Sequence, residues 1–580
     1  MKKTATYPFA WTRKLAGRLI AEPYILVLGV LVAITLFLVV VPLGLLLLSS
    51  FSGARPGVIE NLSLAGYARA YLDPKTYHLF QNTFLYAAGA TFFGLFFGTT
   101  FAWAVERTNM PFKTVAYATI PLTIVIPGAL SSIAWIFLLS PKIGYINKFL
   151  VSLLNLAESP FNIYTLPGMC FVQGLSFTGT VFLMVVPAFQ GLDPALEEAS
   201  ATSGVSTFGT MRRITLKLML PALISAAIYV GMVGISVFEI PAMIGMPKRI
   251  SVFSTKLYMA THGWSRDFAM AGALSMTILL FSFAGIYVYN RMTRQTAKYA
   301  TITGKGYRPR TIDLGMGKYM ALALFATYLT VAIILPILTL IWISLIPYAM
   351  APSREAFSMI SLDSYREVLS YQALRQAIKN TIIMMFTAAT VTMILSSMIS
   401  WIVVRSHVRG RRILDFLAFV PHGIPGIVMG LALIWVYLTF KFIPIYGTVW
   451  IISVAFITRY LSFGTRTTNA AMLQLHRELE EAAQTSGASW GRTFMRIIIP
   501  LLTPAFINGW LFVAVHSMRD LSAPVMLGTG KNVVIAVVIW DLWTNGRVTQ
   551  SAAVGVMLLI IIAMIMLAAR VLGYRIGRKL

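Results

Sequence analysis

Twelve apolar stretches of about twenty residues or more decide what this chain can fold into. About twenty apolar residues in a helix cross the ~30 Å hydrocarbon core of a bilayer, and a segment inside a bilayer must satisfy its own backbone polar groups. Six stretches lie near 24–50, 80–104, 114–140, 166–190, 218–240 and 268–290, and six lie near 319–347, 378–404, 413–440, 445–464, 500–518 and 551–573. The sequence therefore predicts an all-α membrane protein with twelve transmembrane helices.

Charge supports this prediction and suggests an orientation. Only 12% of the 580 residues are charged, which excludes one large soluble enzyme, and the net charge is +27. In a soluble protein that excess would indicate nucleic acid as a partner. With both termini in the cytoplasm, however, 30 of the 47 Lys and Arg residues fall in inside segments, as the positive-inside rule requires. We therefore predict a multi-pass protein with both termini cytoplasmic, whose partner is the lipid bilayer and not nucleic acid.

The two sets of six helices are copies of one another. Residues of the first copy recur 298 positions later in its first part and 283 positions later in its second part. Tyr67, Asn82, Trp103, Arg107 and Pro127 match Tyr365, Asn380, Trp401, Arg405 and Pro425, and Glu197, Gly204, Pro221, Pro241 and Gly245 match Glu480, Gly487, Pro504, Pro524 and Gly528. Each copy has an even number of helices, so both face the same way as parallel repeats. We expect a first half at 1–300, a basic cytoplasmic linker at 301–318 and a second half at 319–580.

A cytoplasmic loop between the fourth and fifth helices of each half, about 191–217 and 466–498, is too polar to cross the membrane. In the first loop, Asp193 followed by Pro194 predicts the start of a short helix, and Gly204 predicts its end. Both loops carry Glu-Glu-Ala and then Ser-Gly. Such a carboxylate pair suits docking into a basic groove of a partner, although an ordinary amphipathic connector is the alternative.

The residues predicted to dock are Glu197, Glu198, Ala199 and Gly204 in the first loop and Glu480, Glu481, Ala482 and Gly487 in the second. The pattern resembles the signature loop of importer-type ATP-binding cassette (ABC) permeases: Glu-Ala-Ala, three residues, Gly, nine residues, then Ile-x-Leu-Pro. The second copy follows it closely. The first has Ser200 in place of the third alanine and Lys217 in place of the proline, which leaves open the angle at which its next helix enters the membrane.

This resemblance implies the type I ABC importer permease fold in a bacterial cytoplasmic (inner) membrane. It also implies that each loop enters a cleft of an ATPase subunit, where Glu198 and Glu481 meet an arginine. The chain itself has no Gly-Lys-[Ser/Thr] phosphate loop, so ATP hydrolysis is expected in a separate subunit and this chain is not predicted to be an enzyme. The expected partners are two copies of the ATPase and a periplasmic substrate-binding protein. No resident cofactor or metal is predicted, and Cys170 is the one cysteine.

Two further segments, 238–245 in the first half and 519–528 with 538–543 in the second, are similar to segments of fused permeases from ferric-iron importers. The resemblance therefore favours ferric iron as the substrate, carried by alternating access. An importer of the same class for aminoethylphosphonate, thiamine or a polyamine is the alternative. A more distant alternative is an ion-coupled secondary transporter, which predicts ionisable residues buried in the middle of the membrane.

The candidate pathway residues are Glu239, Met243, Asp520 and Met526. A hard cation prefers oxygen ligands, and carboxylates within a membrane are costly and usually functional. The two carboxylates lie near the outer ends of the fifth and eleventh helices, where the repeat places them beside a central pathway. Alternatively, they are solvated at the membrane surface or pair with Arg519.

Prolines 121, 127, 421 and 425 lie inside the third and ninth predicted helices. They either break these helices and expose backbone groups to a cavity or introduce a packing kink. The sequence leaves both alternatives open.

Overall fold

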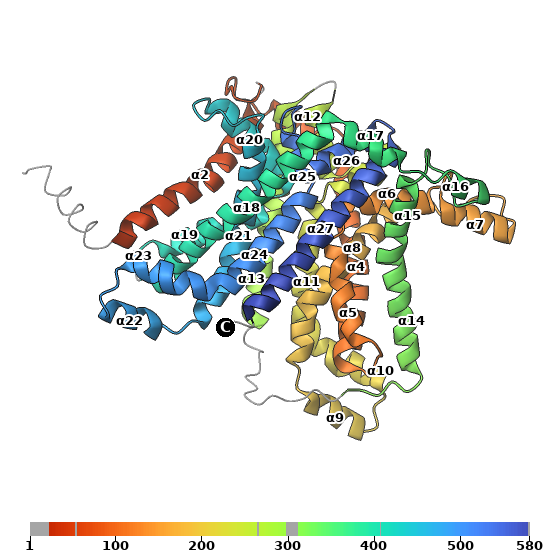
Figure 1. Ribbon diagram of the computed structural model, residues 1–580, viewed down its shortest axis with the longest axis horizontal. Helices are drawn as coiled ribbons and strands as arrows, with labels where there is room; N and C mark the ends of the chain where they lie inside the picture. Colours follow the sequence, from red (N-terminus) through yellow and green to blue (C-terminus); the bar gives the residue numbers. More distant parts are fainter. Residues whose placement is uncertain (1–22, 53–54, 264–265, 297–310, 407, 578–580) are drawn as a thin grey trace, which may run out of the picture.

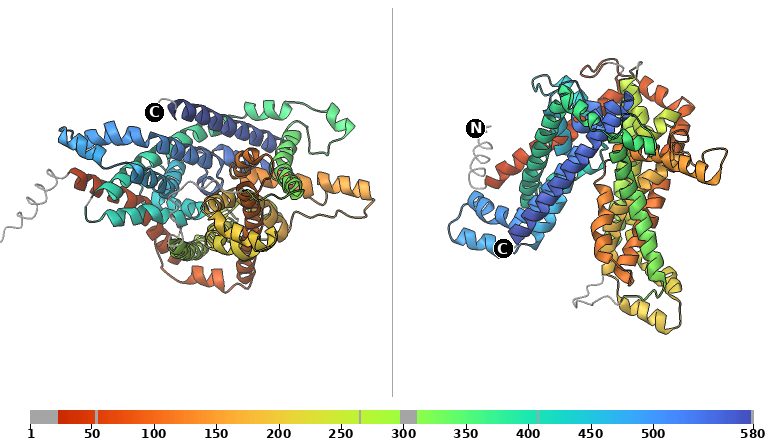
Figure 2. Two further views of the ribbon diagram at one scale, coloured as in Figure 1. Left: turned by 90° about the horizontal axis from the view of Figure 1, so that it is seen from below. Right: turned by 45° about the vertical axis from the view of Figure 1, so that its right-hand side comes forward.

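The computed structural model describes residues 23–52, 55–263, 266–296, 311–406 and 408–577. Within these ranges the chain is almost entirely helical, and its helices form two legs that meet at one end of the molecule and diverge toward the other (Figures 1 and 2). The basic N-terminal segment, residues 1–22, and most of the predicted linker at 301–318 lie outside the described residues.

The first half supplies six membrane-length segments and several short helices. The segments are α2 (Pro23–Phe51), α4 (Lys75–Arg107), α5 with η1 (Lys113–Thr119, Ile120–Ile124) followed by α6 (Gly128–Leu139), α8 (Leu166–Gln190), η2 with α11 (Met211–Thr215, Leu216–Ser236) and α13 (Phe268–Thr296). The short helices are α3 (Ala65–Tyr71), α7 (Tyr145–Leu154), α9 (Pro194–Thr202), α10 (Thr207–Thr210), η3 (Pro241–Gly245), η4 (Met246–Lys248) and α12 (Phe253–His262).

The second half repeats this order. Its segments are α14, η5 and α15 (Gly317–Leu329, Thr330–Ile334, Leu335–Ser344), α18 (Gln372–Arg405), α19 with η6 (Arg411–Phe419, Val420–Gly423) followed by α20 (Gly426–Thr439), α21 (Val449–Gln474), η7 with α24 (Phe494–Ile498, Ile499–Arg519) and α27 (Val548–Gly577). Its short helices are α16 (Arg354–Ser358), α17 (Asp363–Ser370), α22 (Glu478–Thr485), α23 (Trp490–Thr493), α25 (Ser522–Leu527) and α26 (Ile535–Thr544).

The predicted arrangement of twelve spans in two sets of six is confirmed. In the described part of the chain, nine helices are long and apolar enough to cross a membrane, and eleven if each of two sharply bent pairs is one span. The remaining predicted span, the tenth, near 445–464, corresponds to α21, which has 26 residues but carries Arg459 and Arg466. It is therefore long enough to cross but more polar than its neighbours.

The two bent pairs are the third and ninth predicted helices, and the prolines break them. The pair 113–124 and 128–139 is bent by 99°, and the pair 411–423 and 426–439 is bent by 113°. Pro127 and Pro425 stand directly before the second helix of each pair. Their own backbone is extended, with ψ angles of 136° and 145°. A proline has no N–H to donate and disfavours helical geometry in the residue before it, so the break follows from the local sequence.

Each leg contains one helix from the other half. The first leg consists of α4, α5, α8, α11 and α14, and the second of α18, α19, α21, α24 and α27 with α2 (Figures 1 and 2). Phe325 and Tyr328 of α14 pack on Phe101 of α4, with ring centroids 6.1 and 4.8 Å apart. Leu28 and Leu31 of α2 lie in a cluster of buried residues from α18, α19 and α21. The halves are contiguous in sequence, but in space they exchange their first helices.

Candidate functional site

The two polar loops form the predicted helices and lie at the far tips of the two legs. The Asp193 carboxylate accepts a hydrogen bond from the N–H of Ala195 at 2.9 Å, at the start of α9. After α9 and α22 the chain turns at Gly204 and Gly487, whose φ angles are +75° and +77°. Only glycine adopts this left-handed conformation without strain. Helix α9 ends the first leg and α22 the second (Figure 1).

Both loops lead into the membrane in the same way. A four-residue helix is followed by one π-helical turn, at Met211–Thr215 in the first half and Phe494–Ile498 in the second. Lys217 is exposed and does not alter this arrangement. The Ser200 hydroxyl lies 2.8 Å from the Thr210 hydroxyl, within hydrogen-bonding distance. The first copy therefore keeps the geometry of the second despite its two departures from the signature.

The two glutamates of each loop have different surroundings. In the first half, Glu197 forms an ion pair with Arg107 of α4, with 3.3 Å between Oε2 and Nη2. In the second half, Glu480 forms an ion pair with Arg405 of α18, with 2.9 Å between Oε1 and Nε. The glutamates that follow them, at 198 and 481, are exposed, as are Ala199 and Ala482. The loop surface open to a partner therefore contains the second glutamate of each pair.

The end of the linker is attached beside the first of these ion pairs. The N–H of Ile312 donates to the carbonyl of Arg107 at 2.7 Å, and the Asn109 amide donates to Asp313 at 2.5 Å. Hydrogen bonds from the backbone N–H of Gly315 and from Asn109 lower the pKa of the Asp313 carboxyl. The described part of the linker is thus held against the loop end of the first leg.

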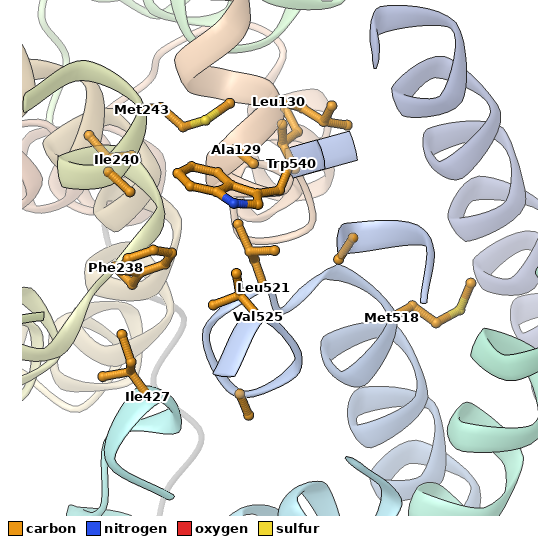
Figure 3. Close-up of a cluster of buried hydrophobic side chains, with 14 of the residues drawn as sticks. Ala129, Leu130, Phe238, Ile240, Met243, Ile427, Met518, Leu521, Val525 and Trp540 are labelled. Carbon is orange, nitrogen blue, oxygen red and sulfur yellow. The ribbon is translucent and has the colours of Figure 1, made fainter. Parts of the chain in front are cut away.

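An apolar cluster lies at the opposite end, where the two legs meet and where Figure 1 labels α12, α25 and α26; Figure 3 draws the cluster in close-up. The rings of Phe238 and Trp540 lie 5.7 Å apart, and that of Tyr258 lies 5.2 Å from Phe238 and 5.9 Å from Trp540. Met243, one of the predicted pathway residues, is buried in this cluster at 0% exposure, and Met526, another, is buried at 3% exposure in the larger hydrophobic core that contains it. The first half contributes Ala129, Leu130, Phe238, Ile240 and Met243, and the second Ile427, Met518, Leu521, Val525 and Trp540. We call this the outer cluster.

Glu239 lies beside the outer cluster and joins the two halves. One carboxylate oxygen accepts a hydrogen bond from the N–H of Ala129 at 3.1 Å, at the start of α6 in its own half. The other accepts from the N–H of Leu521 in the second half at 3.0 Å. A Cβ atom on Gly128 would lie 2.4 Å from this carboxylate, so glycine is required for the approach. The predicted pathway carboxylate therefore has both oxygens engaged by backbone groups.

Arg519 makes the reciprocal connection. Its guanidinium donates to the carbonyls of Ile124 and Ile126 in the first half, the latter at 3.3 Å. These are carbonyls freed by the break before α6. Asp520 does not pair with Arg519: its carboxylate forms an ion pair with Arg459 of α21 and accepts a hydrogen bond from the N–H of Ser522 at 2.8 Å. The broken helix therefore presents its carbonyls to an arginine of the other half.

The two predicted carboxylates are not equivalent in the repeat. At the offset of 283, Glu239 matches Ser522, and Asp520 matches Val237. Among the described residues no group of three or more His, Cys, Asp and Glu side chains could hold a metal ion. A pocket of about 100 Å³ lined by Val27, Met398, Trp401, Gly491, Phe494 and Met495 is apolar and lies in the second leg near α22. It is remote from the outer cluster.

Sequence reasoning did not predict the contacts of four arginines at the two ends of the molecule, Arg107, Arg405, Arg459 and Arg519. Arg107 and Arg405 were visible as repeated residues, and a repeated arginine at the end of a span was a usable signal. Arg459 interrupts an otherwise apolar stretch, which was a second signal. Nothing local in the sequence indicates that Arg519 contacts carbonyls near position 125.

The sequence is similar to those of several known proteins. The sequence model of the family described as "Binding-protein-dependent transport system inner membrane component" matches residues 148–298 and 393–580, more than half of the chain. The chain is 27% identical to the ferric transport system permease protein FbpB of Actinobacillus pleuropneumoniae, across 97% of this chain and 80% of that protein. It is 28% identical to the putative ferric transport system permease protein FbpB 1 of Haemophilus influenzae, across 76% and 68%. A solved bacterial ABC transporter for import of the acidic polysaccharide alginate aligns with 44% of this chain and 94% of its own at 18% identity, with a TM-score of 0.37.

Proposed function

The chain belongs to the family of inner-membrane components of binding-protein-dependent transport systems, and from this premise we propose that it forms both halves of the permease of an ATP-driven ferric-iron importer. The single observation that carries the proposal is the pair of matching loop helices, α9 and α22, one at the tip of each leg. Each presents an exposed glutamate next to an exposed alanine. One chain thus offers two equivalent docking surfaces.

Two copies of a separate ATPase subunit occupy these surfaces. Glu198 and Glu481 are the acidic contacts on the two loop helices, and the left-handed turns at Gly204 and Gly487 set the angle to the helix that follows. A carboxylate at the surface of a short helix is suited to a basic partner groove. The sequence itself holds no Gly-Lys-[Ser/Thr] loop, so hydrolysis belongs to the partner.

Transport follows alternating access between the two ends. The legs diverge toward the loop end and meet at the outer cluster (Figure 2), an arrangement that supports a pathway open to the cytoplasm and closed outside. When ATP draws the two ATPases together, they pull α9 and α22 toward each other. The outer cluster then parts, and Glu239 and Arg519 release the backbone groups of the opposite half. A substrate delivered by a periplasmic binding protein enters at that moment.

Ferric iron is the proposed substrate because both ferric permeases match most of this chain. The oxygens of Glu239 and Asp520 are engaged in the closed arrangement, and opening the outer end frees them. Carboxylate oxygens suit a hard cation. With few fixed charges in the pathway, the binding protein rather than the permease sets most of the selectivity.

The test is uptake by the purified permease in proteoliposomes with its ATPase and binding protein. Ferric iron labelled with a radioisotope should accumulate only with ATP and the iron-loaded binding protein. Aminoethylphosphonate, thiamine and a polyamine, each supplied with the binding protein, are the comparison substrates. Accumulation of one of these instead of iron would overturn the substrate, and accumulation driven by an ion gradient without the ATPase would overturn the importer class.

A further inference from the structure

Both halves use one arginine to hold the first glutamate of the Glu-Glu pair. Arg107 and Arg405 occupy matching positions, at the cytoplasmic ends of α4 and α18. The arginine side chains are 1% and 9% exposed, and those of their partners Glu197 and Glu480 are 11% and 13% exposed. The ion pair is therefore largely buried at the base of the loop helix, and it occurs twice in independently diverged sequence.

The same arginines also bind the end of the fourth span of each half. Arg107 donates to the carbonyl of Leu192 at 3.3 Å. Arg405 donates to the carbonyls of Met472 and Leu475 at 3.1 and 2.6 Å. A guanidinium carries five N–H donors in a rigid plane, so it can serve several acceptors at fixed angles. Each arginine thus joins three segments: the end of one span, the end of another and the loop helix.

The buried glutamates each have a second donor, and that donor differs between the halves. The Thr215 hydroxyl donates to Glu197 at 2.8 Å, whereas the Trp401 indole N–H donates to Glu480 at 3.5 Å. Residue 498, which matches Thr215, is an isoleucine. The inward position of the first glutamate has therefore been retained with a different supporting residue in each half.

We propose that Arg107 and Arg405 are positioning residues for ATPase docking, and that Glu197 and Glu480 are their anchors and not docking contacts. Successive residues of a helix point about 100° apart, so fixing the first glutamate inward turns the second outward. The ion pair thus sets the rotation of α9 and α22 about their axes and transmits movement of the ATPase to α4 and α18. The inference rests on the proposed function, because it assumes that the loops dock on an ATPase.

The test uses the full-length permease in nanodiscs and the ATPase that co-purifies with it from its native membrane. The variant is Arg107→Gln with Arg405→Gln, and the measurement is ATPase activity stimulated by the permease as the ATPase subunit is titrated. We expect the ATPase concentration at half-maximal stimulation to rise at least tenfold, with the maximal rate at saturation within twofold of wild type. Loss of a positioning residue weakens the presentation of the exposed glutamates to the ATPase. A saturating concentration of the ATPase compensates for this weaker binding.

Two further variants separate positioning from loss of folding. Arg107→Lys with Arg405→Lys, which keeps a charged donor for each glutamate, should recover more than half of the apparent affinity that the Arg→Gln variant loses. Arg69→Gln, which removes an arginine paired with Asp267 in a partly exposed ion pair, is the matched control and should leave the titration unchanged.

Three outcomes decide the inference. If no ATPase co-purifies with the wild-type permease, or if the permease does not stimulate the one that does, the proposed function fails. If wild type stimulates it and the Arg→Gln variant gives the same titration curve, the positioning role fails while the function stands. An Arg→Gln variant that lowers only the maximal rate, with an unchanged half-maximal concentration and no recovery in the Arg→Lys variant, also overturns the positioning role.

Discussion

Replacement of Glu239 by glutamine tests whether this carboxylate holds the outer end closed before substrate arrives. In the structure its two oxygens accept hydrogen bonds from the N–H of Ala129 at 3.1 Å and of Leu521 at 3.0 Å, one in each half. Glutamine has the same shape but offers one acceptor and one donor group. One of the two backbone N–H groups then faces the amide NH2 of the glutamine and has no acceptor. The two halves are no longer joined through this side chain.

The size of the effect follows from the lost bond. A hydrogen bond to a charged group contributes about 1.5–3 kcal/mol, and about 1.4 kcal/mol corresponds to a factor of ten in an equilibrium. The equilibrium between the closed and open outer end should therefore shift by about 10- to 150-fold toward open. The apolar packing of Phe238 against Trp540 remains, so the closed arrangement is weakened and not abolished.

The assay measures ATP hydrolysis without binding protein, together with exposure of the outer cluster. Glu239→Gln should raise basal hydrolysis of the reconstituted importer several-fold. A cysteine at Leu521, in a chain with Cys170→Ala, should react faster with a membrane-impermeant maleimide applied outside. Glu355→Gln, which changes an exposed carboxylate of α16, is the matched control.

The opposite result would identify a substrate ligand. In that case Glu239→Gln lowers uptake at limiting substrate while basal hydrolysis and maleimide labelling stay at the wild-type level. That combination, at normal protein abundance in the membrane, would refute the reasoning given above for the outer end.

Three other substitutions follow from the same geometry. Gly128→Ala should raise basal ATP hydrolysis in the same way, because its Cβ would lie 2.4 Å from the Glu239 carboxylate, whereas Gly44→Ala, with nothing within 4 Å, should not. Glu198→Arg with Glu481→Arg should stop uptake and abolish the stimulation of ATP hydrolysis by the loaded binding protein. Uptake at the wild-type rate in this double variant would contradict docking through these carboxylates. Lys217→Pro should leave uptake within twofold of wild type, because both copies already share the π-helical turn, and a large loss would show that the proline position matters.

Much of the loop geometry was predictable because it is local. The cap at Asp193, the proline after it and the glycine turn act within about ten residues, a range over which side-chain capping and backbone preference decide the fold. The breaks at Pro127 and Pro425 are local too, and the sequence left only their extent open. Bends of 99° and 113° settle that question in favour of broken helices.

The contacts that organise function were not predictable, because they join distant positions. Arg107 meets a glutamate 90 positions away, and Arg519 donates to carbonyls nearly 400 positions away. The sequence left three alternatives for Asp520, namely a pathway carboxylate, a solvated residue or a partner of Arg519, and its ion-pair partner in the structure is Arg459 of α21. Which buried charges meet depends on how the spans pack, and hydrophobic periodicity does not encode that choice.

The sequence by itself determined the membrane spans, their duplication and the two loop helices, because apolar length, repeated residues and capping are properties of short segments. Only the tertiary structure decided that α2 and α14 exchange legs, that the first glutamate of each loop turns inward, and that Glu239 and Arg519 join the halves at the outer end. The physical reason is that a buried charge must find a partner within a few ångströms. In a chain of twelve packed spans that partner comes from whichever segment the fold brings alongside.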